Sequence, residues 1–305
     1  MNNYIFGPVQ SRRFGLSLGV DLSPNKKQCN FDCLYCELSP AKTVDSYEDV
    51  VKAEDIVFQL KEALKKHKNI DVITITANGE PTLYPHLKEL IELINNFKEE
   101  TQILILSNGS TIANLEVQES LMLLDQVKLS LDCISEKCFK RLDRVDKSIN
   151  IIALKESMKE FAKRYKGTLL IEVLFVEDVN DKDEEIELLN EVLKEINPTR
   201  VDIGTIDRPP AFDVKPVSYE KLFEIAKKFD TSLNVHIVSR HKGENIEDSY
   251  SREEILQTLS KRPLTKGDIE TLFDADSRTR LDELVEKNEV YINADDNVYF
   301  YCLKS

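Results

Sequence analysis

The sequence predicts an α/β protein with a parallel β-sheet, followed by a second, smaller domain. Strand-like and helix-like segments alternate six times between residues 16 and 229, which is typical of parallel strands joined by right-handed crossovers. A polar stretch at residues 239–249 then leads into three helical segments and a hairpin. Six repeats suit a partial barrel, and an open, doubly wound sheet is the alternative that periodicity leaves open.

Apolar, β-branched runs predict the strands, and amphipathic spacing predicts the helices between them. The expected strands are residues 16–21, 71–76, 102–106, 126–131, 168–176 and 200–206, with a short extended piece at 234–238. The expected helices are residues 54–67, 85–97, 115–123, 148–165, 183–195 and 218–229. The second helix illustrates the pattern, because Leu87, Leu90, Ile91 and Ile94 fall on one of its faces.

The last part of the chain has a different pattern. We expect helices at residues 252–260, 266–272 and 278–288 and a hairpin at 290–301 that turns at 294–297. The predicted domains are therefore residues 1–240 and 249–305, and the second resembles a winged helix-turn-helix domain. It has 8 Lys and Arg against 12 Asp and Glu, a net charge of −4, whereas modules that read DNA grooves are normally positive. We expect a substrate lid, a dimerisation element or a protein-binding module, and no binding to duplex DNA.

Composition narrows the class of protein. A hydrophobic content of 41% and a charged content of 31% are those of a soluble globular protein. We expect no membrane segment, since no apolar run approaches the roughly 18–20 residues that span a bilayer. We also expect no signal peptide. Six cysteines, three of them in one short motif, do not indicate a disulfide framework, so we expect a reducing, cytoplasmic location. The net charge of −14 disfavours long nucleic acids as ligands.

Three cysteines, Cys29, Cys33 and Cys36, follow the first strand at the spacing C-x3-C-x2-C. Thiolate is a soft ligand that suits iron–sulfur clusters, zinc or Cu(I). Three cysteines bound to a [4Fe–4S] cluster leave one iron open to a small molecule. A closed zinc site would need a fourth protein ligand, and no Cys or His lies within thirty residues on either side of the motif.

This motif, with the aromatic Tyr35 before its third cysteine, resembles the cluster signature of the radical S-adenosylmethionine (SAM) superfamily. Residues 6–21 also look like one branch, the Fe–S oxidoreductases related to the tRNA-wyosine synthases. The resemblance implies a partial (β/α)6 barrel similar to a TIM barrel, a [4Fe–4S] cluster, and SAM chelated by the open iron. It also implies cleavage of SAM to a 5′-deoxyadenosyl radical, after reduction by an external one-electron donor such as flavodoxin or ferredoxin.

The end of the second strand carries Asn78, Gly79 and Glu80. Functional groups of parallel barrels gather at the carboxyl ends of strands. A glycine there lets the backbone approach a ligand, while a carboxylate receives a cation. The resemblance implies that Glu80 holds the SAM ammonium group, with Asn78 where the family usually has glycine. The alternative is an ordinary Asn-Gly turn with an exposed glutamate.

The next strand ends supply further candidates for cofactor binding. Ser107 and Asn108 end the third strand, and alternation places Ser130 and Asp132 on the same side of the fourth. The resemblance implies contacts of these two regions with the SAM carboxylate and ribose. It further implies apolar and backbone contacts to adenine where the fifth strand ends, at Val176. Helix N-capping is the alternative for the serines and the aspartate.

Three arginines are candidates for substrate binding. Arg208 precedes two prolines at the end of the sixth strand, and a rigidly presented guanidinium suits a carboxylate or phosphate. Arg12 and Arg13 are the other cations of a potential basic pocket. The alternative for Arg208 is a surface arginine without such a role.

The other three cysteines, Cys133, Cys138 and Cys302, form a weak pattern for an auxiliary cluster. We interpret them as buried or incidental thiols. The tRNA-wyosine synthases, which this chain resembles, bind a second cluster through cysteines upstream of the SAM motif. Here no cysteine precedes Cys29, which argues against that particular activity.

Three hypotheses about function remain open. The first is a radical SAM oxidoreductase that acts on a small or modified-nucleobase substrate, which the acidic composition favours. The second is a tRNA-modifying radical SAM enzyme, which the resemblance to one branch favours. The third is an iron–sulfur sensor with a DNA-binding wing. SAM binding discriminates against the sensor, which has no need of an ammonium site at Glu80.

We predict that anaerobically reconstituted protein holds about four irons per chain. Replacing Cys29, Cys33 or Cys36 with alanine is expected to abolish the cluster, because each ligates one iron. Replacing Cys133, Cys138 or Cys302 is expected to leave the iron content unchanged. Iron and sulfide analysis of the six variants tests this, and loss of iron from the Cys138 or Cys302 variant would contradict a single cluster.

Overall fold

Eight strands form one sheet in the order in which they occur along the chain. The structure is a computed structural model that describes residues 3–11, 13–238, 249–261, 263–295 and 298–304. The strands are β1 (Ile5–Ser11), β2 (Gly15–Asp21), β3 (Val72–Thr76), β4 (Gln102–Ser107), β5 (Gln126–Ser130), β6 (Thr168–Phe175), β7 (Arg200–Thr205) and β8 (Val235–Ile237). All neighbouring pairs from β2 to β8 are parallel, and β1 is antiparallel to β2. A doubly wound sheet would reverse its strand order at a switch point, so the sequential order confirms the partial barrel.

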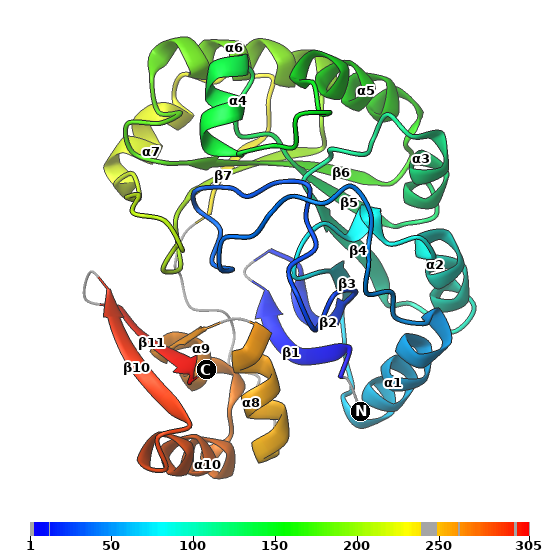
Figure 1. The fold of residues 1–305 in the computed structure, drawn as a ribbon, viewed down its shortest axis with the longest axis vertical. Helices are drawn as coiled ribbons and strands as arrows, with labels where there is room; N and C mark the ends of the chain where they lie inside the picture. The colour runs from blue at the N-terminus through cyan, green and yellow to red at the C-terminus, as the bar shows by residue number, and fades with distance from the viewer. Residues whose placement is uncertain (1–2, 12, 239–248, 262, 296–297, 305) are drawn as a thin grey trace.

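Helices cover the outer face of this curved sheet (Figure 1). They are α1 (Ala53–Lys66), α2 (Leu87–Asn95), α3 (Leu115–Leu121), α4 (Glu136–Leu142), α5 (Ile151–Arg164), α6 (Asp183–Ile196) and α7 (Tyr219–Ala226), with a 3-10 turn, η1 (Pro81–Leu83). The predicted apolar face of α2 is confirmed, since Leu90, Ile91 and Ile94 are fully buried. None of the helices in the described ranges combines the length and apolar character that a bilayer-spanning segment needs.

The two faces of the sheet differ in chemistry. Ile73, Val127 and Ile171 belong to the apolar core that includes the helices. Successive residues of a strand point to opposite faces, so Lys128 and Glu172 point to the inner face. The outer face therefore supplies most of the apolar burial that stabilises the fold, and the inner face is left for polar groups.

The strand β1 and the helix α4 were not predicted, and neither was the short 3-10 turn η1. β1 contains Gly7 and Pro8, which interrupt a strand pattern, and its register with β2 shifts between Phe6 and Val9. Proline is tolerated there because β1 is an edge strand. The helix α4 has only 7 residues, too few to show a clear helical period, and the Ser135 side chain caps it by accepting from the Cys138 amide.

The C-terminal part contains the predicted three helices and hairpin. The elements are α8 (Arg252–Lys261), β9 (Leu264–Thr265), α9 (Lys266–Leu272), α10 (Ala275–Glu286), β10 (Val290–Asp295) and β11 (Val298–Leu303). The short β9 completes a three-stranded sheet in the order β10–β11–β9. The predicted linker and hairpin turn lie largely outside the described residues. The winged-helix interpretation and the domain boundaries at 240 and 249 stay predictions.

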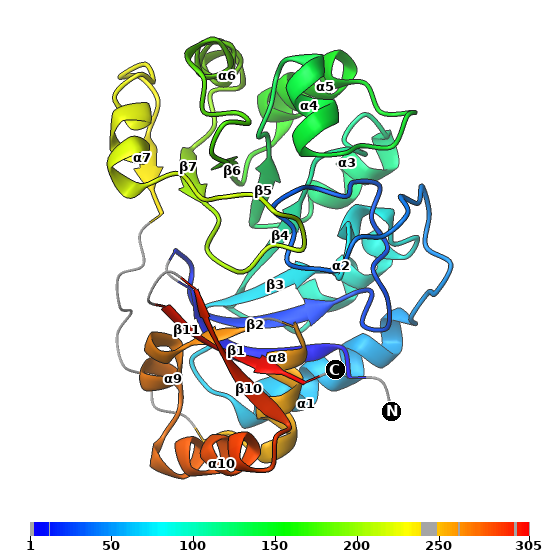
Figure 2. The same cartoon turned by 60° about the vertical axis from the view of Figure 1, so that its left-hand side comes forward.

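This C-terminal unit packs against β1 and the end of α1 (Figure 2). Tyr250 is fully buried there, with its ring 4.7 Å from that of Phe273 and 6.3 Å from that of His67. The Tyr250 hydroxyl donates to the carbonyl of Pro8 in β1. His67, which follows α1, is buried, because α8 places Glu254 against it.

We predict that Tyr250→Ala destabilises the protein by roughly 3–5 kcal/mol, the usual cost of emptying a buried aromatic site. The exposed Tyr299 in β11 is a matched control, and Tyr299→Ala is expected to cost about 0.5 kcal/mol or less. Urea unfolding of both variants measures the difference. Equal stability of the two would mean that Tyr250 does not fasten the C-terminal unit to the barrel.

Candidate iron–sulfur and cosubstrate site

The loop that carries the three cysteines crosses the carboxyl ends of the strands and is fixed there by backbone hydrogen bonds. The Gln28 amide donates to Asn78 O at 2.9 Å, and the Glu80 amide donates to Gln28 O at 2.9 Å. Gly79 lies between them with φ of +143°, and a Cβ at this position would be 1.9 Å from Gln28 O. Glycine is therefore required at position 79, and the close approach sets Cys29 beside the end of β3.

The other half of the loop rests on α4 and on the segment after β7. The Leu34 amide donates to Leu142 O at 2.8 Å, and the Asp32 amide donates to Asp143 O at 3.1 Å. Farther along, the Ala211 amide donates to Cys36 O at 2.9 Å. The cysteine loop is thus held by elements from three separate parts of the barrel.

The three thiols fit a polynuclear cluster better than a single zinc ion. A tetrahedral zinc site brings its sulfurs to about 3.8 Å from one another. Within the described residues, the sulfurs of Cys29, Cys33 and Cys36 do not all lie within 4.8 Å of one another. Burial, and then the Glu80 carboxylate, raise the pKa of Cys29 to about 12. A cationic metal centre is therefore needed to hold this sulfur as a thiolate.

Glu80 is buried at 1% exposure and is the centre of a hydrogen-bond network. Its Oε1 accepts from Thr82 N at 2.9 Å, Thr82 Oγ1 at 2.5 Å and Ser107 Oγ at 2.7 Å, whereas Oε2 accepts from Asn108 N at 2.7 Å. The alternative interpretation of Glu80 as an exposed residue of an Asn-Gly turn is thereby excluded. A carboxylate has about four lone-pair sites, so Oε2 keeps capacity for one further donor.

The predicted cofactor residues at the end of β4 join this network. Ser107 binds Glu80, and Asn108 Nδ2 lies 3.7 Å from Cys29 Sγ and 3.0 Å from Asn30 Oδ1. Asn78 donates its amide to Asp21 Oδ1 at 3.0 Å. These contacts bring the ends of β3 and β4 and the first cysteine together.

Tyr35 and Asp132 connect the cysteine loop to the end of β5. The Tyr35 hydroxyl donates to Asp132 Oδ2 at 2.5 Å, and the Leu174 amide donates to Asp132 Oδ1 at 2.6 Å. Burial raises the pKa of Asp132 to about 7. Ser130 and Asp132 line the same pocket, which also contains Tyr35 and Asn108. Val176 does not line this pocket, because its side chain is fully buried and its amide donates to Asn180 Oδ1 at 2.8 Å.

The arginines predicted to bind substrate are found in different places. Arg208 pairs with Glu37 at 2.5 Å, next to Cys36. Arg13 instead pairs with Glu172 at 2.7 Å and with Asp202 at 3.1 Å, on the inner face of the sheet. Arg12 lies outside the described residues. The structure thus places Arg208 at the cysteine loop and Arg13 inside the barrel.

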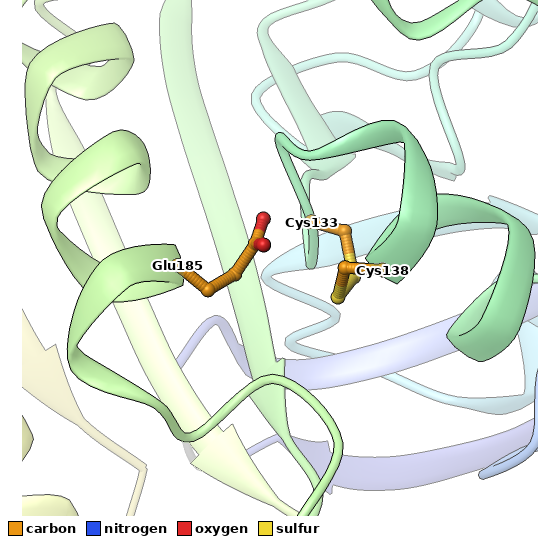
Figure 3. A group of neighbouring side chains, drawn as sticks. All are labelled: Cys133, Cys138 and Glu185. Atoms are coloured by element: carbon orange, nitrogen blue, oxygen red, sulfur yellow. A yellow bond between two sulfur atoms is a disulfide. The ribbon is translucent and has the colours of Figure 1, made fainter.

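Cys133 and Cys138 form a disulfide, so their interpretation as incidental thiols was wrong (Figure 3). Both are buried, as expected, and so is Cys302. The sulfurs of Cys133 and Cys138 and a carboxylate oxygen of Glu185 lie within 4.8 Å of one another. That carboxylate is already engaged, because it accepts from the amides of Ile134 and Ser135 and from the Ser135 hydroxyl. The bridge joins the end of β5 to the first turn of α4, the helix that supports the cysteine loop.

We predict that Glu80→Ala weakens SAM binding by roughly tenfold to more than a hundredfold and leaves the iron content unchanged. The reason is the loss of one charge-assisted contact, on the order of 1.5–3 kcal/mol. Glu48→Ala serves as a control, since Glu48 is an exposed acid of the same loop. Calorimetry on reconstituted protein measures the affinities. Unchanged affinity in the Glu80 variant would assign this carboxylate a purely structural role.

Three solved structures illustrate the fold that this chain shares with known proteins. A radical SAM methyltransferase from Sphaerobacter thermophilus has a TM-score of 0.57 at 16% identity, covering 74% of this chain and 67% of that one. SuiB of Streptococcus suis bound to S-adenosylmethionine has a TM-score of 0.58 at 20% identity, covering 75% and 51%. TYW1 with a lysine-pyruvate adduct has a TM-score of 0.50 at 18% identity, covering 69% and 72%.

Sequence comparison gives closer relatives. A UPF0026 protein of Helicobacter pylori strain J99 is 42% identical over 301 residues, covering 98% of this chain and 97% of the relative. The UPF0026 protein of Methanocaldococcus jannaschii is 31% identical, covering 88% and 85%. A probable GTP 3′,8-cyclase of Saccharolobus islandicus is 31% identical over 121 residues, covering 39% and 36%. The family model of the Radical SAM superfamily matches residues 27–189. The chain therefore belongs to the radical SAM superfamily and, within it, to the UPF0026 proteins.

Proposed function

We propose that this protein is a radical SAM oxidoreductase whose 5′-deoxyadenosyl radical removes a hydrogen atom from a small or modified-nucleobase substrate. The observation that carries the proposal is the arrangement around Glu80. A buried carboxylate with one remaining lone-pair site lies beside Cys29, at the carboxyl ends of β3 and β4. An ammonium group bound there would lie next to the first cluster ligand, as chelation of SAM by the open iron requires.

The groups bound at the site supply the redox chemistry, and the protein's residues position them. Cys29, Cys33 and Cys36 would hold a [4Fe–4S] cluster, which when bound would supply the one-electron reduction of SAM. The side-chain amide of Asn108 contacts Cys29, the first of these cysteines. The backbone N–H of Asn108 donates to Glu80 and orients its carboxylate. Hydrogen bonds from fixed groups avoid the reorganisation that solvent would require.

Tyr35 and Asp132 would form the wall on the opposite side of the bound cosubstrate. Asp132 already has both oxygens engaged, by Tyr35 and by the Leu174 amide. A SAM hydroxyl contacting this residue would therefore meet a carboxylate that is held in one orientation. Ser130, two residues earlier on the same strand, is available on the same pocket wall.

Two observations favour a small substrate over a nucleic acid. The net charge of −14 opposes the phosphate contacts that long nucleic acids need. Part of the chain is similar to a protein named as a probable GTP 3′,8-cyclase. This similarity supports a nucleobase substrate. Modification of tRNA is the second candidate, favoured by the fold shared with TYW1.

The remaining parts of the proposal concern partners and location. The protein would act in the cytoplasm and receive its electron from flavodoxin or ferredoxin. The C-terminal unit, proposed to be winged-helix-like, would serve the barrel rather than bind duplex DNA. Arg208 supports this role, since it pairs with Glu37 of the cysteine loop and is also influenced by the charge of Asp268 in α9. An iron–sulfur sensor with a DNA-binding wing is disfavoured by the enzymes among the relatives.

The test is formation of 5′-deoxyadenosine by the anaerobically reconstituted protein in the presence of SAM and dithionite. We expect the nucleoside to form in a cluster-dependent reaction, and we expect none from the Cys33→Ala variant. Chromatography with mass detection quantifies it. A fully loaded wild-type protein that binds SAM but forms no 5′-deoxyadenosine, with or without cell extract as a source of substrate, would contradict the proposed function.

A further inference from the structure

A cluster of charged side chains lies on the inner face of the barrel, away from the cysteines. We call it the lumen cluster, and its members are Arg13, Lys128, Glu172, Arg200 and Asp202. Four of its members come from the neighbouring strands β5, β6 and β7, in which Glu172 is in register with Ser130 on one side and with Asp202 on the other. Arg13 reaches in from the turn between β1 and β2.

The ion pairs within the lumen cluster are unevenly distributed. Arg200 and Asp202 form one pair, with Nε and Oδ1 2.8 Å apart. Glu172 Oε1 receives two cations, Lys128 and Arg13. The described members thus include three cations and two carboxylates. One unit of positive charge is left inside a protein whose net charge is −14.

Arg13 has donors to spare. Its contacts to Glu172 and Asp202 both use Nη1, whereas a guanidinium carries five N–H groups on three nitrogens. Its side chain is 23% exposed, and that of Glu172 is 29% exposed, so this end of the lumen cluster is open. A guanidinium with an open edge matches carboxylates and phosphates, which it binds through two parallel hydrogen bonds.

Stability alone does not explain charges at these positions. Inward-facing residues of parallel barrels are mostly branched and apolar, because they fill a packed core. Buried ion pairs often contribute no more than apolar residues of similar volume. The Lys128 side chain is only 4% exposed, and burial lowers the pKa of its amine to about 8. Burying charged side chains on three adjacent strands costs free energy, and this cost is expected where the charges bind a ligand.

The lumen cluster lies on the same side of β5 as two residues proposed to contact SAM, Ser130 and Asp132. Lys128, Ser130 and Asp132 are alternate residues of β5 and its extension, so they point to the same side. At about 3.3 Å per residue, Lys128 lies roughly 13 Å along the strand from Asp132. A substrate that spans this distance would hold one end at the lumen cluster and present the other to the residues proposed to contact SAM.

We propose that the lumen cluster binds an anionic group of the substrate, a carboxylate or a phosphate, through Arg13 and Lys128. This inference rests on the proposed function, because it names the substrate class of the same barrel. Glu172 holds the two cations in place and Arg200 neutralises Asp202. The anion then balances the remaining positive charge.

The experiment uses full-length, anaerobically reconstituted protein with two probes, inorganic phosphate and acetate, each compared with chloride at equal ionic strength. Thermal shifts over a concentration series give the dissociation constants. We expect saturable stabilisation by at least one probe, and the probe that binds distinguishes the phosphate from the carboxylate source. Lys128→Met is expected to weaken that binding about tenfold or more, because a charge-assisted contact is lost.

Lys88→Met is the matched control, since Lys88 is a surface lysine that is also paired with a glutamate, and it is expected to bind the probe like the wild type. Arg13→Gln replaces Lys128→Met if the latter does not fold. Absence of saturable binding, unchanged affinity in the variants, or unfolding of both would overturn the proposal and leave a purely structural network. Formation of 5′-deoxyadenosine by the wild type is measured separately, so a failure of the proposed function is distinguished from a failure of anion binding.

Discussion

The site depends on the close contact between the Gln28 backbone and Gly79. Two hydrogen bonds join Gln28 to Asn78 and Glu80 across this contact, so the cysteine loop continues the sheet at the end of β3. The absence of a side chain at position 79 permits the approach. The same backbone geometry directs Glu80 toward Ser107 and Asn108 and brings it near Cys29. A cluster ligand and a buried carboxylate are thereby placed side by side before any ligand binds, which lowers the entropic cost of binding.

The barrel divides its structural and chemical tasks between the two faces of one sheet. The outer face buries aliphatic residues such as Ile73 and Val127 against the helices, and this burial dominates the stability of the fold. The inner face carries Lys128, Glu172 and Asp202, whose charges oppose folding unless they are paired. Ser130 and Asp132 follow Lys128 at alternate positions of β5 and its extension, so these polar groups lie on the same side of the sheet.

Much of the fold was predictable because the parallel strands and amphipathic helices are long and regular. The cysteines and the residues at the ends of β3 to β5 were also predictable, since barrel strands present their ends to one site. Strand β1 was missed because Gly7 and Pro8 break its pattern, and the Cys133–Cys138 disulfide was missed because sequence does not reveal pairing. The charges of the lumen cluster were visible as single charged residues within apolar strands. Their convergence required the register of β5, β6 and β7.

We propose that SAM binds through its amino group at a cluster held by Cys29, Cys33 and Cys36, with Glu80 alongside. The most direct test is electron–nuclear double resonance on the reduced, reconstituted protein with SAM labelled with ¹⁵N at the amino group. We predict a ¹⁵N coupling to the cluster, which requires the nitrogen to be bound to iron. Spectra that are identical with labelled and unlabelled SAM, from protein saturated with SAM, would contradict it.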